Sequence, residues 1–363
     1  MNSNLLMRRL FFASPATALI SRSFVCAKAV STSNKKKPLV FLGSPEVSAG
    51  VLADLFDASE TPDSIFEVAA IVTQPPSRRG RGRKLLNSPV AELALDRSFS
   101  PDLIFTPEKA NEESFLSSLK ELQPHVCVTA AYGNILPTKF LKIPLMGTVN
   151  VHPSLLPLYR GAAPVQRALQ NNAKETGVCL AYTVRALDAG PIIACEKIHV
   201  DEHIKAPELL DLLFSLGSKL LIRELPFIFD GSAKEKARPQ DDSNATLAPK
   251  LTSDESWLSF DDEATCLHNK VRAFAGWPGT RATLAIVNEE DGSQETVVAK
   301  IVSTRVGPRG AFGADVTFSN GSLKIPCGND GTLEVLELQL PGKNVVNAAA
   351  FWNGLRGKRL TKL

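Results

Sequence analysis

The sequence predicts an α/β fold: a Rossmann-like, doubly wound N-terminal domain followed by a small, OB-like β-barrel. From Pro38 onward, short β-rich apolar runs alternate with helix-like segments. A polar stretch follows, and beyond it short strand-like segments are separated by Gly, Asn and Asp. With 363 residues, 44% of them hydrophobic and 22% charged, the chain is long enough for two buried cores.

The first 37 residues hold seven Lys and Arg, several Ser and Thr, and no acidic residue. This composition is typical of a transit peptide, so we expect residues 1–37 to be disordered and removed after import. A plain disordered tail and a secretory signal are the alternatives, and Pro15 counts against the signal. Arg8 and Arg9 beside apolar residues favour the mitochondrial matrix, although leaders for the chloroplast stroma have similar compositions.

The net positive charge of the chain comes from this leader. Removing its seven positive charges changes the formal net charge from +3 to about −4. A nucleic-acid partner must then be bound by local basic patches rather than by an overall positive field. No run of about 18 apolar residues without charges occurs, so we expect no membrane partner, and a monomer is the default expectation.

The predicted catalytic domain covers residues 38–230. Its strands are expected in PLVFLGS, FEVAAIVTQ, PHVCVTAAYG and TVNVHPS, and its helices near Glu46–Ala58, Pro89–Arg97 and Ala206–Glu224. Ligands of such domains bind at the carboxyl ends of the strands. Chemistry is therefore expected in the residues that directly follow these apolar runs.

Residues 231–250 are the predicted linker because they are polar and poor in large apolar side chains. The β-barrel is expected over residues 251–363. It opens with a helical pattern near Thr265–Ala275 and continues with the strand-like segments RATLAIV, TVVAKIVST, GSLKIPCG and TLEVLELQL.

The cysteines are widely spaced, and no C-x-x-C motif occurs, so we expect neither a metal site nor a redox motif. Cys127, Cys179 and Cys195 lie in apolar strand-like runs. A small buried thiol is the usual state of such a residue, and it suits a reducing compartment.

The densest group of candidate catalytic residues is GTVNVHPSLLPLYRGAAPVQRAL, residues 147–169. Side chains alternate along a strand, so Asn150 and His152 project to the same face, and Pro153 ends the strand. Asp188 follows the apolar run VCLAYTVRAL at another expected junction between strand and turn. Each of these residues has a structural alternative, since Asn and His near turns often satisfy backbone groups and Asp often forms an Asx-turn.

A basic segment, RRGRGRK from Arg78 to Lys84, carries five positive charges in seven residues. Two glycines make a stable helix unfavourable, so we expect a flexible loop suited to phosphate contact, with a generic solvated loop as the alternative. Lys343, Arg356, Lys358 and Arg359 near the C-terminus either add phosphate contacts or form a solvated end of the chain.

Together these motifs resemble the formyl-tetrahydrofolate transferases, and among them the branch that formylates methionyl-tRNA. The resemblance runs from about Pro38 to the C-terminus. It rests on FLGSPE, TQPPSRRGRGRKLLNSPV, AAYGNILP, NVHPSLLP-x-YRGAAP, ETGV, LDAGP and RAFAGWPGT.

The resemblance implies a catalytic trio of Asn150, His152 and Asp188. It implies 10-formyltetrahydrofolate as the formyl donor, without a metal, and the α-amine of initiator methionyl-tRNA as the acceptor. Asn150 and His152 would donate hydrogen bonds to the oxyanion of the tetrahedral intermediate. Asp188 would hold the imidazole and keep the pKa of His152 high, or accept a proton from the amine, directly or through a water. The sequence does not divide these roles, so the trio is assigned as a unit.

The resemblance also implies two walls of a folate site and one tRNA-contacting loop. The first wall is Ser154, Leu155, Leu156 and Pro157, and the second includes Tyr132 and Gly133. In the tRNA loop the important arginine falls on Arg81, and because this loop departs from the usual form, Arg79, Arg83 and Lys84 share the predicted contact.

Two other functions are consistent with part of the sequence. Glycinamide ribonucleotide transformylase and formyl-tetrahydrofolate hydrolase share the trio, but neither explains the RGRGRK segment joined to a C-terminal barrel. A non-catalytic RNA-binding protein would be expected to have lost part of the trio, which is intact here.

Overall fold

The computed structural model describes residues 35–79, 84–310 and 313–363. Nearly all of the predicted transit peptide lies outside the described residues, and so do Arg81 and Arg83 of the basic segment. The first strand begins at Lys37, one residue before the expected start of the catalytic domain. The Lys37 backbone N–H donates to the Ile65 carbonyl oxygen at 2.9 Å, and its ammonium group lies over the Phe229 ring.

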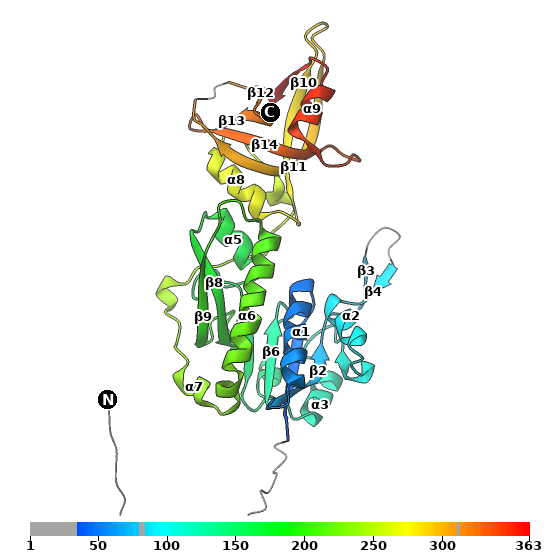
Figure 1. Cartoon of the computed structure of the whole chain (residues 1–363), viewed down its shortest axis with the longest axis vertical. Coiled ribbons are helices and arrows are strands. Elements are labelled where there is room, and N and C mark those ends of the chain that lie inside the picture. The colour runs from blue at the N-terminus through cyan, green and yellow to red at the C-terminus, as the bar shows by residue number, and fades with distance from the viewer. Residues whose placement is uncertain (1–34, 80–83, 311–312) are drawn as a thin grey trace, which may run out of the picture. The chain divides into compact units, whose positions relative to one another are not determined.

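A seven-stranded sheet of order β5-β2-β1-β6-β7-β8-β9 forms the core of the first domain (Figure 1). The pairs from β5 to β7 are parallel, whereas β7–β8 and β8–β9 are antiparallel. A short antiparallel hairpin of β3 and β4 stands apart from this sheet. The strands are β1 (Lys37–Gly43), β2 (Phe66–Val72), β3 (Ser77–Arg79), β4 (Lys84–Leu86), β5 (Ile104–Phe105), β6 (Val126–Ala130), β7 (Thr148–His152), β8 (Glu175–Tyr182) and β9 (Ile192–His199).

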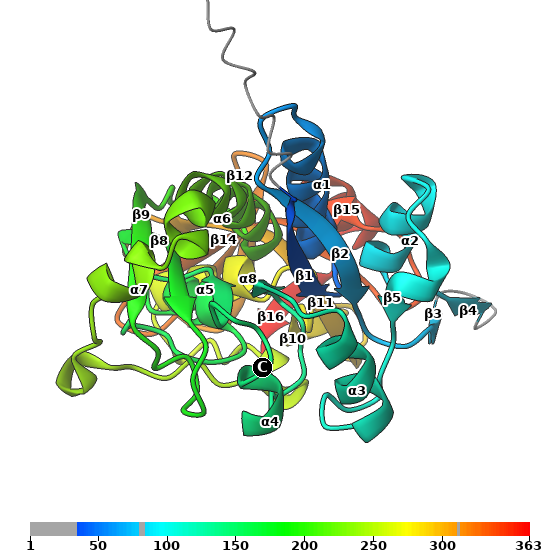
Figure 2. The same cartoon turned by 90° about the horizontal axis from the view of Figure 1, so that it is seen from below.

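Helices cover both faces of the sheet, as Figure 2 shows. Helices α1 and α6 pack on one face with Leu39 and Phe41, and α3 and α4 pack on the other with Val40 and Leu42. Both faces are therefore buried, which explains the continuous apolar run in β1 and confirms the predicted doubly wound α/β domain. The helices are α1 (Glu46–Glu60), α2 (Pro89–Asp96), α3 (Glu113–Glu121), α4 (Thr138–Leu141), α5 (Pro164–Gln170), α6 (Ala206–Phe229) and α7 (Ser232–Lys236), with a 3-10 turn at Pro101–Leu103.

Helix α6 supports the strand on which the catalytic residues are predicted. A Cβ at Gly217 would lie 2.5 Å from Cγ1 of Val151 and 2.9 Å from Cγ2 of Val178. A larger residue at Gly217 would push the helix away from β7 and β8. The glycine thus permits α6 to pack closely against one face of β7 and β8.

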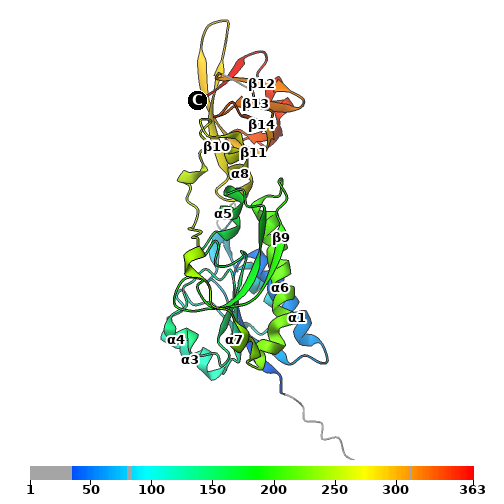
Figure 3. The ribbon, with the colours of Figure 1, turned by 90° about the vertical axis from the view of Figure 1, so that its left-hand side faces the viewer.

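The second domain is a closed antiparallel barrel of six strands, which confirms the predicted β-barrel but not a number of strands, since only four were predicted. Pairing of β11 with β14 closes the order β11-β10-β16-β12-β13-β14, and β15 extends the sheet beyond β14 (Figures 1 and 3). Two strands of the barrel, β12 and β16, were not predicted, because each is short and places few residues in the core. The elements are α8 (Ala264–Ala273), β10 (Thr280–Val287), β11 (Gln294–Gly307), β12 (Asp315–Ser319), β13 (Ser322–Pro326), β14 (Thr332–Gln339), β15 (Val346–Asn347), α9 (Ala348–Gly354) and β16 (Arg359–Lys362).

Helix α8 packs against α5 through apolar side chains, and the 3-10 turn at Asp254–Ser256 adds an ion pair with α5. Phe274, at the end of α8, is fully buried in a cluster with Val165, Leu169 and other side chains from α5 and α6. Arg167 on α5 forms an ion pair with Glu255 at 2.6 Å. The guanidinium group lowers the pKa of Glu255 to about 2, so the carboxyl group is ionised throughout the neutral range.

The stretch that the sequence assigns to a linker, residues 231–250, lies along the first domain. It contains α7 and a 3-10 turn at Asp242–Asn244, and a second such turn follows at Asp254–Ser256. Arg238 forms a backbone bridge with Ile192, and Leu247 forms one with Arg160. Two segments of the catalytic domain are therefore bound to it.

The prediction of free buried thiols is wrong for two cysteines. Cys179 on β8 and Cys195 on β9 form a disulfide, because the antiparallel register places them directly opposite each other. Cys127 is a buried free thiol, as expected. Among the described residues, no helix is long and apolar enough to span a bilayer.

Candidate active site

The side chains of Asn150, His152 and Asp188 converge at one place. Asn150 and His152 lie two positions apart on β7, and the strand ends at His152, as the following Pro153 predicts. Asn150 Nδ2 donates to Asp188 Oδ1 at 3.4 Å, and His152 Nδ1 lies 3.8 Å from Asp188 Oδ2. The three groups thus share one small volume, as a catalytic trio requires.

Asp188 does not lie at a strand end, which corrects the position expected from the sequence. Strand β8 ends at Tyr182, six positions before Asp188. Asp188 lies in the loop before β9 with a backbone φ of +47°. Its Oδ2 accepts a hydrogen bond of 2.9 Å from the backbone N–H of Gly161. A second loop therefore contributes to the orientation of the carboxylate.

Thr129 sets the orientation of the Asn150 amide. The Thr129 hydroxyl on the neighbouring strand β6 donates to Asn150 Oδ1 at 2.7 Å. The Asn150 NH₂ group is thereby directed to Asp188, which accepts one of its two hydrogens. The other hydrogen is suited to donation to a substrate oxygen.

His152 is held in one tautomer. Its Nε2 lies 3.0 Å from the carbonyl oxygen of Tyr159, which can only accept, so Nε2 carries the hydrogen in this bond. In the neutral ring Nδ1 then has the free lone pair, on the side of Asp188. The ring can accept a proton at Nδ1 and later return it.

The expectation that Asp188 keeps the pKa of His152 high is wrong in its net direction. Burial lowers the pKa of His152, and this effect outweighs the opposing effects of Asp188 and of the hydrogen bond to Tyr159. His152 is only 4% exposed, so an imidazolium there would lose most of its hydration. The resting imidazole is therefore neutral at neutral pH.

Two further histidines, His125 and His268, have pKa values lowered mainly by burial. As the pH falls below about 6.5, the unfolded chain binds protons at these positions that the folded chain does not. The free energy of unfolding should therefore decrease between pH 7.5 and 5.5. The measurement is the melting temperature across this range.

The His268→Gln variant supplies the comparison for this pH dependence. Glutamine can still bond to Thr304 and to the Glu202 carbonyl oxygen, which His268 contacts, but it does not titrate. It should reduce the pH dependence of the melting temperature, whereas His199→Gln, at an exposed position, serves as control. If the melting temperature of His268→Gln depended on pH as steeply as that of the wild type, His268 would not contribute to this pH dependence.

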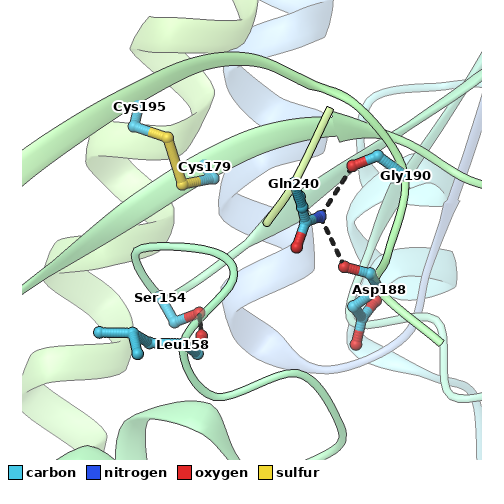
Figure 4. Close-up of a disulfide and its surroundings, with 7 residues drawn as sticks. All are labelled: Ser154, Leu158, Cys179, Asp188, Gly190, Cys195 and Gln240. Carbon is cyan, nitrogen blue, oxygen red and sulfur yellow. Dashed lines mark hydrogen bonds between the residues drawn. A yellow bond between two sulfur atoms is a disulfide. The ribbon is translucent and has the colours of Figure 1, made fainter. Parts of the chain in front are cut away.

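The segment predicted as the first folate wall turns most of its side chains inward. Ser154 is fully buried, and its hydroxyl donates to the Leu158 carbonyl oxygen at 2.6 Å, which closes the loop (Figure 4). Leu155 lies over Gly177, and Leu156 packs against the Cys179–Cys195 disulfide. This wall presents backbone groups, together with the half-buried Pro157 and the exposed Leu158, to a ligand.

The second predicted wall also presents mainly backbone. The Tyr132 side chain is buried between the sheet and α3, while its carbonyl oxygen accepts hydrogen bonds from Gln74 Nε2 and Ser44 Oγ. Gly133 follows with a φ of +88°, a conformation that favours glycine. Folate contact at both walls remains a prediction.

Three residues of the basic segment, Arg78, Arg79 and Lys84, lie in strands rather than in the expected loop. Arg79 on β3 pairs with Lys84 on β4 in an antiparallel hairpin. The Lys84 side chain is exposed, whereas Arg81 and Arg83 lie outside the described residues. Of the C-terminal basic residues, Arg359 lies 4.0 Å from Glu289 and 3.8 Å from Asp315, so its charge is partly balanced within the barrel.

Sequence reasoning missed the residues that orient the trio. Thr129 has no local signal, because its role follows from the register of β6 against β7. Arg160 and Gly161 are part of the quoted motif, but their contacts with Gln240 and Asp188 depend on distant segments. The described residues contain no group of His, Cys, Asp and Glu that could hold a metal.

Comparisons with known proteins match both domains. Residues 37–225 match the formyl transferase family model, and residues 250–356 match the model of the formyl transferase C-terminal domain. The chain is 36% identical to the methionyl-tRNA formyltransferase of Pelobacter propionicus, over 88% of this chain and 93% of the relative. It is 34% identical to the methionyl-tRNA formyltransferase of Thermotoga maritima, over 88% and 95% of the respective chains.

Solved structures share the fold at lower identity. A sugar 3N-formyl transferase, WlaRD, described with dTDP and 5-N-formyl-THF, aligns with a TM-score of 0.58 at 17% identity, over 85% of this chain and 99% of that one. An N-formyltransferase from Helicobacter canadensis, described with folinic acid and dTDP-3-aminofucose, aligns with a TM-score of 0.58 at 15% identity, over 83% and 98%. The matched domains and the identity over most of the chain show that this protein belongs to the methionyl-tRNA formyltransferase family of formyl transferases.

Proposed function

We propose that the protein transfers the formyl group of 10-formyltetrahydrofolate to the α-amino group of initiator methionyl-tRNA, for translation initiation in an organelle. The observation that carries this proposal is the convergence of Asn150, His152 and Asp188 in a chain of this family. The formyl donor is supported by the description of the related sugar formyltransferase with a formylated tetrahydrofolate.

The reaction forms a bond between the amine nitrogen and the formyl carbon, and the electron pair of the C=O π bond moves to the oxygen. The free N–H of Asn150 donates to this oxyanion. Collapse of the intermediate then breaks the bond between the formyl carbon and N10, and one proton must pass from the amine to the folate nitrogen. Tetrahydrofolate leaves.

Asp188 and His152 are placed to carry this proton. The neutral imidazole accepts at Nδ1, and the Asp188 carboxylate stabilises the imidazolium that forms. The arrangement needs an ionised Asp188 and a neutral resting His152. Burial favours the neutral form of the histidine, and the Asp188 carboxylate accepts N–H groups from Asn150 and Gly161, which fix its position.

The exposed Lys84 side chain supports tRNA binding, since it adds positive charge to the sequence segment that also includes Arg79, Arg81 and Arg83. The decisive assay supplies formyl-tetrahydrofolate with and without methionyl-tRNA. Formylation of the aminoacyl-tRNA is expected. Folate hydrolysis at the same rate without tRNA would instead indicate a hydrolase.

The organellar setting rests on the leader of residues 1–37, which is rich in Arg and Ser and free of acidic residues. We place the protein in the mitochondrial matrix, with the chloroplast stroma as the alternative. A fusion of the first 40 residues to a fluorescent reporter distinguishes the two, and a diffuse cytosolic signal would exclude both.

A further inference from the structure

Gln240, in the segment that joins the two domains, bonds directly to the loop that carries Asp188. Its Nε2 donates to the carbonyl oxygens of Asp188 at 2.8 Å and of Gly190 at 2.7 Å (Figure 4). Its Oε1 accepts from Arg160 Nε at 2.9 Å and Nη2 at 2.8 Å. Carbonyl oxygens only accept and guanidinium groups only donate, so the orientation of the amide is unambiguous. The amide nitrogen and the amide oxygen of Gln240 each take part in two hydrogen bonds.

The loop that receives these bonds has few other supports. Its residues 184–187 are exposed, and Asp188 adopts a left-handed backbone conformation, which is unfavourable for most L-residues. Such a conformation persists only where surrounding contacts hold it. Gly190 is enclosed tightly, since a Cβ there would lie 1.6 Å from the Tyr182 carbonyl oxygen. The Gln240 amide spans the turn between Asp188 and this enclosed glycine.

Arg160 connects Gln240 to the other side of the carboxylate. Arg160 is 8% exposed, and its backbone N–H and C=O bond to the Thr246 carbonyl oxygen at 2.8 Å and the Ala248 N–H at 2.7 Å. The next residue, Gly161, donates its N–H to Asp188 Oδ2. The joining segment thus holds the backbone of Asp188 through Gln240 and positions the donor to its carboxylate through residues 160–161.

We infer that Gln240 is a positioning residue for catalysis, and that the segment joining the domains sets the geometry of Asp188. This inference rests on the proposed function, because only that function gives Asp188 a role in proton transfer. Gln240 itself acts on the backbone of the loop and is expected to contribute to kcat, with little effect on substrate binding.

The test compares Gln240→Ala and Gln240→Glu with Asn244→Ala as the matched control. Glutamate keeps the shape and the bond to Arg160, but it replaces the NH₂ group by an oxygen that faces two carbonyl oxygens. Both Gln240 variants should lower kcat by about 10- to 100-fold, the range expected when a catalytic group is misplaced by about 1 Å, with KM values changed less than about threefold. Asn244, whose amide donates to Asp241 in the same segment, should be dispensable.

A double-mutant cycle separates positioning from a general structural effect. In single-turnover experiments with excess enzyme, Gln240→Ala should have little further effect on the rate once Asp188 is replaced by alanine. An equal loss in both backgrounds, or wild-type kcat in both Gln240 variants, would overturn the inference. If Gln240→Ala does not fold by circular dichroism, Gln240→Glu carries the same cycle. A wild-type enzyme that does not formylate methionyl-tRNA would instead refute the proposed function.

Discussion

Asp188→Asn is expected to lower kcat for formyl transfer by about 10³-fold. The substitution keeps the size of the side chain but removes the charge that faces His152 Nδ1 at 3.8 Å. It also replaces one carboxylate oxygen by an NH₂ group. Because Asn150 and Gly161 both donate to this side chain, one of them would then face another donor.

The measurement for Asp188→Asn is steady-state formylation combined with tRNA binding. The affinity for methionyl-tRNA should change less than about twofold, since the expected loss lies in the chemical step. Asp57→Asn is the control, because Asp57 is an exposed carboxylate whose ion pair with Arg97 lies on the surface. Retention of more than about a tenth of wild-type kcat by Asp188→Asn would show that the trio is assigned wrongly.

Asn150→Ala should lower kcat by about 10²- to 10³-fold, the usual effect of removing one preorganised donor to an oxyanion. The variant loses the N–H that is free to donate to the substrate oxygen and the contact with Asp188. The KM for formyl-tetrahydrofolate should change little, because the lost hydrogen bond strengthens only as charge develops.

Thr129→Val tests the orientation of the Asn150 amide and should have a smaller effect than Asn150→Ala. The valine keeps the packing of β6 but cannot donate to Asn150 Oδ1, so the amide loses its preferred orientation while both hydrogens remain. A loss of about tenfold in kcat is expected, intermediate between wild type and Asn150→Ala. A Thr129→Val enzyme that is as slow as Asn150→Ala would mean that the hydroxyl, not the amide, makes the essential contact.

Local patterns predicted the strand that carries two of the three catalytic candidates. Alternation along TVNVHP placed Asn150 and His152 on one face, and Pro153 predicted where β7 ends. Similar short-range signals located α1, α2, α6 and α8, and the strands β1, β2, β6, β7, β10, β11, β13 and β14. The strands that were not predicted include β5, β9, β12 and β16. A strand as short as β5, β12 or β16, with few core positions, has no pattern distinguishable from a loop.

The protonation of His152 and the pairing of Cys179 with Cys195 were beyond such patterns. The protonation of His152 depends on how completely the ring is buried. The charge of Asp188 alone predicted a raised pKa for His152, whereas burial lowers it. The disulfide pairing depends on the register between β8 and β9, since a shift of one residue would direct the two cysteines to opposite faces of the sheet.

The amino-acid sequence alone was enough for the order of the elements, the two-domain architecture and the face of β7 on which Asn150 and His152 project. These features follow from interactions among residues only a few positions apart. The approach of Asp188 to the other two side chains, and its support by Gln240 from 52 residues away, arose only when the chain had packed. A hydrogen bond between distant segments depends on the whole intervening fold, and no local pattern encodes it.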